Sequence, residues 1–185
     1  MTQQLCTKKI SIAISLVIFV LAGTAFAAGD HGHGHGEIDG KVGPIIEYRE
    51  LTTDETTIQA VLDTYAQAME QKSVEVMEQA VIPGDFSTIE SGYPNWTWED
   101  FRDNHLLVEM DTFTDVNYDI KLISGEFQGS LGFAIYQYTA SGKIQDKTVS
   151  ISGLGTAILE QTDGSWRIHH LHTSAPRSQL EGMGG

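Results

Sequence analysis

The segment from Trp166 to Ser174 constrains the fold more than any other part of the sequence. Read as a β-strand, it alternates between two faces with a period of two residues. One face then carries two imidazoles beside a tryptophan and an isoleucine, which a packed core seldom holds. We therefore predict that this face is the floor of a ligand pocket. It comprises Trp166, Ile168, His170 and His172, and the opposite face comprises Arg167, His169 and Leu171.

The first 27 residues have the pattern of a secretory signal peptide. Two lysines precede an apolar run at 10–21, and Ala25-Phe26-Ala27 supplies small residues at the spacing of a cleavage site. The alternative, a membrane anchor, needs a run of about 20 apolar residues, and the run at 10–21 is shorter than that. We expect residues 1–27 to be removed and the protein to be exported, to the periplasm or the medium.

Cleavage would also change the composition. Cys6, the single cysteine of the 185 residues, would be lost, leaving no disulfide, thiol nucleophile or thiolate metal site. The remaining chain would have 9 Lys and Arg against 25 Asp and Glu, a formal charge of −16. Such a chain repels nucleic acid and anionic lipid, so neither is expected as a partner.

Residues 28–51 are predicted to form a flexible segment rich in His and Gly. Alternating His and Gly offers no apolar face and cannot fold alone. Its imidazoles at His31, His33 and His35 could hold Zn, Cu or Ni, or the tract could be a polar spacer.

Three helices are predicted next. Thr52 and Glu55 have the spacing of a capping box before an apolar helical face. Ser73 would cap a second helix, and a third would begin after Asn95 or Thr97. The apolar positions are Ile58, Val61, Leu62, Tyr65 and Met69, then Val74, Met77 and Val81, then Trp98, Phe101, His105 and Val108. His105 would therefore lie either in the core or in the pocket.

Strands dominate the rest of the chain. Alternation predicts strands at 86–90, 116–122, 127–139 and 147–160, with turns at 91–94, Gly125, 141–142 and 163–164. The 127–139 strand has two apolar faces and should be covered on both sides. Gly153 and Gly155 indicate a bulge or sharp bend. The prediction is an α+β domain over 52–175, with N-terminal helices on a strongly curved antiparallel sheet, and a flexible tail at 176–185.

This layout resembles the SnoaL-like family of the nuclear-transport-factor-2-like (NTF2-like) superfamily. The resemblance covers about residues 52–175. The motifs that carry it are Phe101-Arg102-Asp103-Asn104-His105-Leu106, the Glu109 that follows, Gly153-Leu154-Gly155-Thr156-Ala157, and Trp166-Arg167-Ile168 running into His170-Leu171-His172-Thr173-Ser174.

The resemblance implies a cone-shaped fold with a deep pocket and a homodimer formed through the sheet. Members include polyketide cyclases, steroid isomerases, dehydratases, the oligomerising domain of a calmodulin-dependent kinase, and binding proteins without a known reaction. That kinase domain has an arginine after a similar His-x-His strand, where this chain has Thr173. Arg102 is a candidate replacement for carboxylate binding.

The sequence leaves three functions open. The first is the binding of a small, partly apolar ligand in a pocket formed by His105, Tyr136, Trp166, His170, His172, Glu90, Trp96 and Arg102. The second is an isomerase, cyclase or dehydratase, which needs a pocket carboxylate and a hydroxyl donor. Candidate acids are Glu90, Glu109 and Asp119, the last on a wet strand face, and candidate donors are Tyr93, Tyr118, Tyr136 and Tyr138. The third is metal binding, by the His-Gly tract or by His105, His170 and His172 together.

Overall fold

The computed structural model describes residue 46 and residues 48–176. The predicted signal peptide, the His-Gly tract and residues 177–185 of the predicted tail lie outside the described residues. The elements are α1 (Thr53–Gln71), α2 (Val74–Ala80), β1 (Ser87–Glu90), β2 (Tyr93–Asn95), α3 (Trp98–Phe101), the π-helix η1 (Arg102–Leu106), α4 (Leu107–Thr112), β3 (Phe113–Gln128), β4 (Leu131–Ile144), β5 (Lys147–Thr162) and β6 (Ser165–Ser174).

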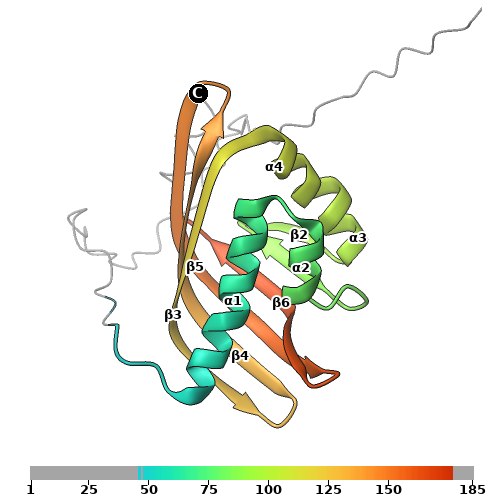
Figure 1. Ribbon diagram of the computed structural model, residues 1–185, viewed down its shortest axis with the longest axis vertical. Helices are drawn as coiled ribbons and strands as arrows, with labels where there is room; N and C mark the ends of the chain where they lie inside the picture. The colour runs from blue at the N-terminus through green and yellow to red at the C-terminus, as the bar shows by residue number, and fades with distance from the viewer. Residues whose placement is uncertain (1–45, 47, 177–185) are drawn as a thin grey trace, which may run out of the picture.

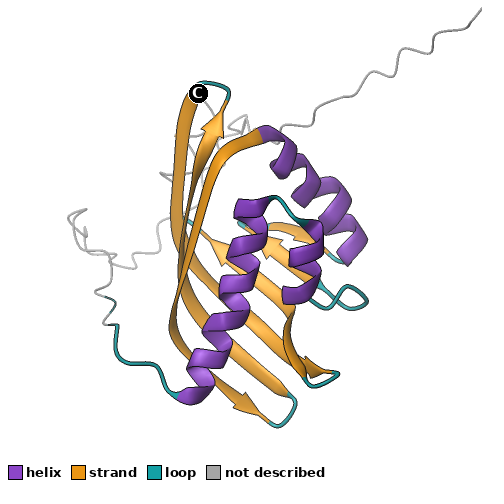
Figure 2. Cartoon of the chain, viewed as in Figure 1, coloured by secondary structure: helices purple, strands orange, loops and turns teal. Residues whose placement is uncertain are grey.

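Six strands form one curved, unclosed sheet in the order β2-β1-β6-β5-β4-β3. Neighbouring strands are antiparallel except β1 and β6, which run parallel. The helices lie on one side of this sheet, with α1 crossing it and α3, η1 and α4 forming one continuous segment (Figure 1, Figure 2). The α+β class is confirmed. Within the described residues, no helix is long and apolar enough to cross a membrane.

Side-chain caps start the helices where the sequence predicts. The Thr52 side chain accepts a hydrogen bond from the Glu55 amide at 3.2 Å, and Glu55 accepts one from the Thr52 amide at 2.9 Å. Ser73 caps α2, and Thr97 caps α3. Each cap satisfies an amide that the helix itself leaves without a partner.

The π-helix η1 displaces the predicted apolar stripe of the third helical segment. Trp98 and Phe101 are buried as expected, but the next buried residues are Leu106 and Met110, and Val108 is 52% exposed. A π turn closes its hydrogen bonds over one residue more than an α turn, so every later side chain is rotated around the axis. The prediction for Val108 is therefore wrong.

Strands β3 and β4 are longer than predicted. Gly125 lies inside β3, where a Cβ atom would be 2.8 Å from Ile58 Cδ1 of α1. This glycine therefore permits close approach of helix and sheet, and does not mark a turn. Gly142 lies within β4, so the turn predicted at 141–142 is also absent. The Asp163-Gly164 turn is confirmed, with both residues at positive φ.

Gly153 and Gly155 make room for aromatic rings. Of the predicted bulge or sharp bend, the bulge is absent, since the pairing of β4 with β5 has no register shift, while the sheet is curved as expected. A Cβ atom at Gly155 would lie 2.3 Å from the Tyr136 ring, and one at Gly153 would lie 2.7 Å from the Tyr138 ring. Both tyrosines are buried. Small residues on β5 thus allow large ones on β4.

One face of β4 is uncovered, contrary to prediction. Ala134, Tyr136 and Tyr138 are buried beneath the helices, but the alternate residues are exposed. We call the exposed set the outer apolar patch, which consists of Leu131, Phe133, Ile135, Leu154 and Ile158.

A bulge in β6 reverses the predicted faces of its second half. Leu159 pairs with Ile168, while the preceding residue Ile158 pairs with His170, so His169 is an extra residue in β6. The predicted alternation holds for Ile168, which is buried, and fails beyond the bulge. Leu171 and Thr173 are the residues that point inward.

Candidate functional site

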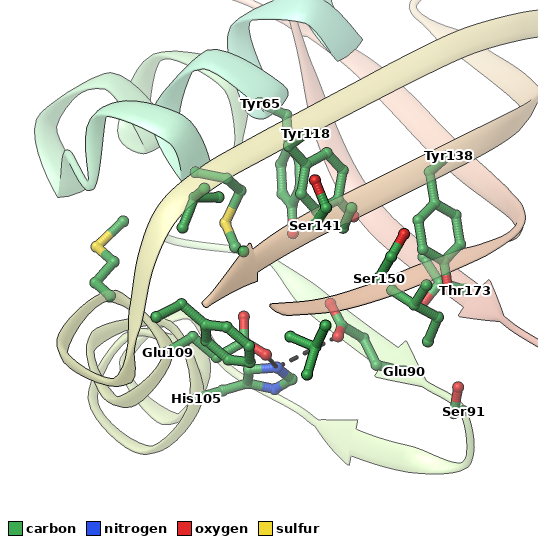
Figure 3. A pocket seen from close by; sticks show the side chains of 18 of the residues that line it. Tyr65, Glu90, Ser91, His105, Glu109, Tyr118, Tyr138, Ser141, Ser150 and Thr173 are labelled. Atoms are coloured by element: carbon green, nitrogen blue, oxygen red, sulfur yellow. Dashed lines mark ion pairs between the residues drawn. The ribbon is translucent and has the colours of Figure 1, made fainter. Parts of the chain in front are cut away.

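A cavity of about 390 Å³ lies between the helices and the concave side of the sheet (Figure 3). Its walls are largely apolar, hydroxyl groups are spread around them, and the charged side chains lie together on one side. The lining residues are Tyr65, Met69, Glu90, Ser91, Tyr93, His105, Glu109, Met110, Phe113, Val116, Tyr118, Tyr138, Ala140, Ser141, Gly142, Val149, Ser150, Ile151 and Thr173.

Three charged side chains meet at the wall of this cavity. His105 Nε2 lies 3.3 Å from Glu90 Oε2 and 3.4 Å from Glu109 Oε1 (Figure 3). Glu90 is the last residue of β1, His105 lies in η1, and Glu109 follows on α4 one helical turn later. We call these residues the carboxylate–imidazole cluster.

The other imidazole nitrogen fixes the protonation of His105. Asn95 Nδ2 donates to Asp100 Oδ2 at 3.1 Å, which orients the amide so that Asn95 Oδ1 faces His105 Nδ1 at 3.1 Å. An amide oxygen only accepts, so Nδ1 carries a proton. Nε2 faces two carboxylates, which favours a second proton there.

His105 is consequently an imidazolium at neutral pH. Burial lowers its pKa, but hydrogen bonds and charge interactions with Glu109 and Glu90 outweigh burial and raise the pKa from 6.5 to about 10. A single positive charge then stands between two carboxylates. With both ionised, the cluster has a net charge of −1.

Tyrosines form much of the opposite wall. Tyr118 packs edge-on against Tyr65, with ring centroids 6.2 Å apart, and stacks on Tyr138 at 6.1 Å. Burial raises the pKa of all three phenols, with a further contribution from Glu90, and that of Tyr138 reaches about 12. They therefore remain neutral hydroxyls at physiological pH.

Two of the predicted pocket residues, His105 and Glu90, line this cavity. Tyr136 is fully buried in the core instead. Trp166 stacks on Phe127 with ring centroids 3.8 Å apart. Neither Tyr136 nor Trp166 is among the cavity-lining residues.

His170 and His172 lie on the outer side of the sheet because of the β6 bulge. His170 Nδ1 is 2.8 Å from the Ser87 hydroxyl, and His172 is exposed. They do not meet His105, so the predicted three-histidine centre is not formed. Over the described part of the chain, no group of three His, Cys, Asp or Glu residues could hold a metal ion.

Trp96 and Arg102 also lie away from the cavity. Trp96 is 67% exposed. Arg102 pairs with Asp103 at 2.7 Å, so it does not replace an arginine after the His-x-His strand. His31, His33 and His35 lie outside the described residues.

Other cavity residues were harder to identify from sequence. Glu109 was one of three candidate acids, and its spacing of four residues from His105 was the available signal. Asp119 lies on the wet face as predicted, where it pairs with Lys121 at 3.6 Å. The sequence did not indicate Tyr65 or Thr173 as cavity residues. Tyr65 has the position of an ordinary core residue, and Thr173 points inward only because of the bulge in β6.

Solved structures of the same fold include proteins with different assignments. An NTF2-like superfamily protein from Salmonella enterica superposes with a TM-score of 0.60 at 16% identity, covering 65% of this chain and 89% of that one. A Shewanella frigidimarina protein provisionally described as a ketosteroid isomerase gives 0.53 at 17% identity, covering 66% and 98%. One from Novosphingobium aromaticivorans, provisionally described as a scytalone dehydratase, gives 0.60 at 10% identity, covering 65% and 83%.

At these identities the structural likeness establishes the fold alone. A search of curated proteins by sequence finds no match. The model of the SnoaL-like domain family, however, matches residues 58–178, which is more than half of the chain. This chain therefore belongs to the SnoaL-like domain family, and its fold is similar to that of an NTF2-like superfamily protein.

Proposed function

We propose that this SnoaL-like domain binds a small, partly apolar molecule in the cavity beside the carboxylate–imidazole cluster. The supporting observation is the cavity itself, about 390 Å³ with largely apolar walls, scattered hydroxyl groups and one cluster of charged side chains. Ligand sites commonly combine these features, since apolar walls provide affinity and a few polar groups fix orientation.

A cavity-filling variant tests this proposal. A library of fragments would be screened against the full chain by ligand-observed NMR, and hits would be re-tested with Ala140→Phe, which adds an aromatic ring to the cavity wall. Loss of the hits in Ala140→Phe, but not in the exposed variant Glu75→Gln of α2, is expected. Circular dichroism would establish that both variants are folded. Hits that survive Ala140→Phe would place the site elsewhere.

A second candidate is proton-transfer catalysis of the isomerase or dehydratase kind. Glu90 and Glu109 are carboxylates at an apolar cavity, and His105 has its Nε2–H directed between them. A carboxylate could take a proton from a carbon next to a carbonyl and return it to another carbon of the same molecule, so that no co-reactant is consumed. Tyr138, which remains a neutral phenol, could donate to the oxygen that becomes negative.

Hydrogen–deuterium exchange tests this candidate without knowing the substrate. A panel of cyclic ketones and enones would be incubated with the full chain in D₂O, and C–H exchange would be followed by proton NMR. We expect exchange by the wild type and Glu75→Gln, and a loss of about a hundredfold or more in Glu90→Gln if Glu90 is the base. Exchange unchanged in both Glu90→Gln and Glu109→Gln would reject proton transfer by these carboxylates.

We also propose that the protein is exported after loss of residues 1–27 and forms a homodimer through its sheet. The sequence pattern of the N-terminus supports export, and the outer apolar patch supports the dimer. Intact mass spectrometry of the protein from a bacterial periplasm should give the mass of residues 28–185. The full-length mass would contradict cleavage.

A further inference from the structure

The cavity has more hydrogen-bond acceptors than donors at its charged side. Glu90 and Glu109 present four carboxylate oxygens, each able to accept, whereas His105 offers them one N–H. No Lys or Arg is among the described cavity-lining residues. A ligand that donates hydrogen bonds therefore complements this side better than one that accepts them.

The charge balance points the same way. The two carboxylates are partly buried, with side chains 26% and 37% exposed, and one imidazolium compensates them. A partly buried net negative charge is costly without a counter-charge. A cationic ligand would supply that charge, while an anionic ligand would add to the repulsion.

Aromatic rings on the cavity wall suit a cation as well. Tyr65, Tyr118 and Tyr138 line the cavity together with Phe113. The faces of aromatic rings carry partial negative charge and attract ammonium groups within about 6 Å. Burial, and to a lesser extent the charge of Glu90, raises the pKa of all three tyrosines, so they remain neutral phenols beside a bound cation.

We propose that the cavity selects an organic ammonium compound, with its N–H groups donating to Glu90 and Glu109 and its apolar part against Met69, Met110 and Val116. This inference rests on the proposed binding function and adds the chemical class of the ligand. A carboxylate ligand is disfavoured, in agreement with Thr173 in place of an arginine.

Three probes with one skeleton test the proposal. Binding of 4-phenylbutylamine, 4-phenylbutanol and 4-phenylbutanoate to the full chain would be measured by titration calorimetry at pH 7.5. The expected order is ammonium, then alcohol, with about tenfold between them, and then carboxylate. This ranking uses wild-type protein and so does not depend on any variant folding.

Variants then assign the preference to the cluster. Glu90→Gln and Glu109→Gln should each weaken ammonium binding and leave alcohol binding within about twofold, while Glu75→Gln provides a control with the same loss of charge. Equal or tighter binding of the alcohol or carboxylate would overturn the ammonium proposal but leave the binding function intact. An ammonium preference unchanged in both cluster variants would also overturn it. Absence of binding by all three probes, with no hits from the fragment screen, would overturn both.

Discussion

His105 Nε2 lies 3.3 Å from Glu90 Oε2, although His105 belongs to the π-helix η1 and Glu90 to strand β1. Glu109 approaches the same nitrogen from α4 at 3.4 Å. The cluster thus joins the helical segment to the sheet beside the cavity. The amide of Asn95, held by Asp100, fixes the imidazole from its other side.

The protonation of His105 should persist well above neutral pH. Its pKa of about 10 in the folded protein exceeds the ordinary value of 6.5, so its stabilising effect is fully present below pH 6.5 and is lost as pH rises through 10. In ¹⁵N NMR spectra, both ring nitrogens should keep imidazolium shifts at pH 8.5. An imidazole that becomes neutral between pH 6 and 7 would contradict the assigned geometry.

Unfolding by urea gives an independent check of His105. The difference in unfolding free energy between wild type and His105→Gln should shrink as pH is raised from 6.5 to 10. Glu75→Gln compared in the same way should show no such trend, since no described contact ties Glu75 to the cluster. A difference that grows with pH would contradict the expected sign.

Gly155→Ala should destabilise the fold. The added Cβ would lie 2.3 Å from the buried Tyr136 ring, and overpacking of this kind costs about 1–3 kcal/mol. Thermal melting should show a lower Tm, partly restored in Gly155→Ala with Tyr136→Leu, which removes the ring. The matched control is Gly84→Ala, where a Cβ would meet no atom within 4 Å. Equal effects at both glycines would contradict the packing explanation.

Local signals predicted the helices well, because each start depends on one capping side chain and a stripe of apolar residues. The faces of β6 could not be predicted beyond Ile168, since the bulge at His169 is set by pairing with β5. The π turn likewise moved Val108 outward, although helical periodicity placed it inward. The sequence identified Glu90 and His105 as residues of the site. It did not identify Thr173, because that residue points into the cavity only as a result of the bulge in β6.

Charges placed in the outer apolar patch should dissociate the proposed homodimer. Phe133 and Ile158 are paired across β4 and β5 and are both exposed. Phe133→Glu with Ile158→Glu would bury carboxylates in any interface formed here, at a cost of several kcal/mol. Light scattering should give a dimer mass for wild type and a monomer mass for the double variant. A wild-type monomer at micromolar concentration would contradict the proposal.

We propose that the His-Gly tract binds Zn, Cu or Ni; the alternative is a polar spacer that binds none of them. Replacing His31, His33 and His35 with Ala should abolish binding of Ni²⁺ measured by calorimetry. His170→Ala with His172→Ala should retain it, since these residues do not form a three-ligand centre in the described structure. The reverse pattern would place the metal on the outer face of the sheet.

A crystallographic fragment screen of the wild-type protein would show whether the cavity is the ligand site. Crystals would be soaked with neutral, ammonium and carboxylate fragments small enough for a cavity of about 390 Å³. We expect fragments in the cavity, with a polar group within hydrogen-bonding distance of Glu90, Glu109 or His105. Fragments bound only outside it, such as beside His170 on the outer face, would contradict the assignment of the cavity as the ligand site.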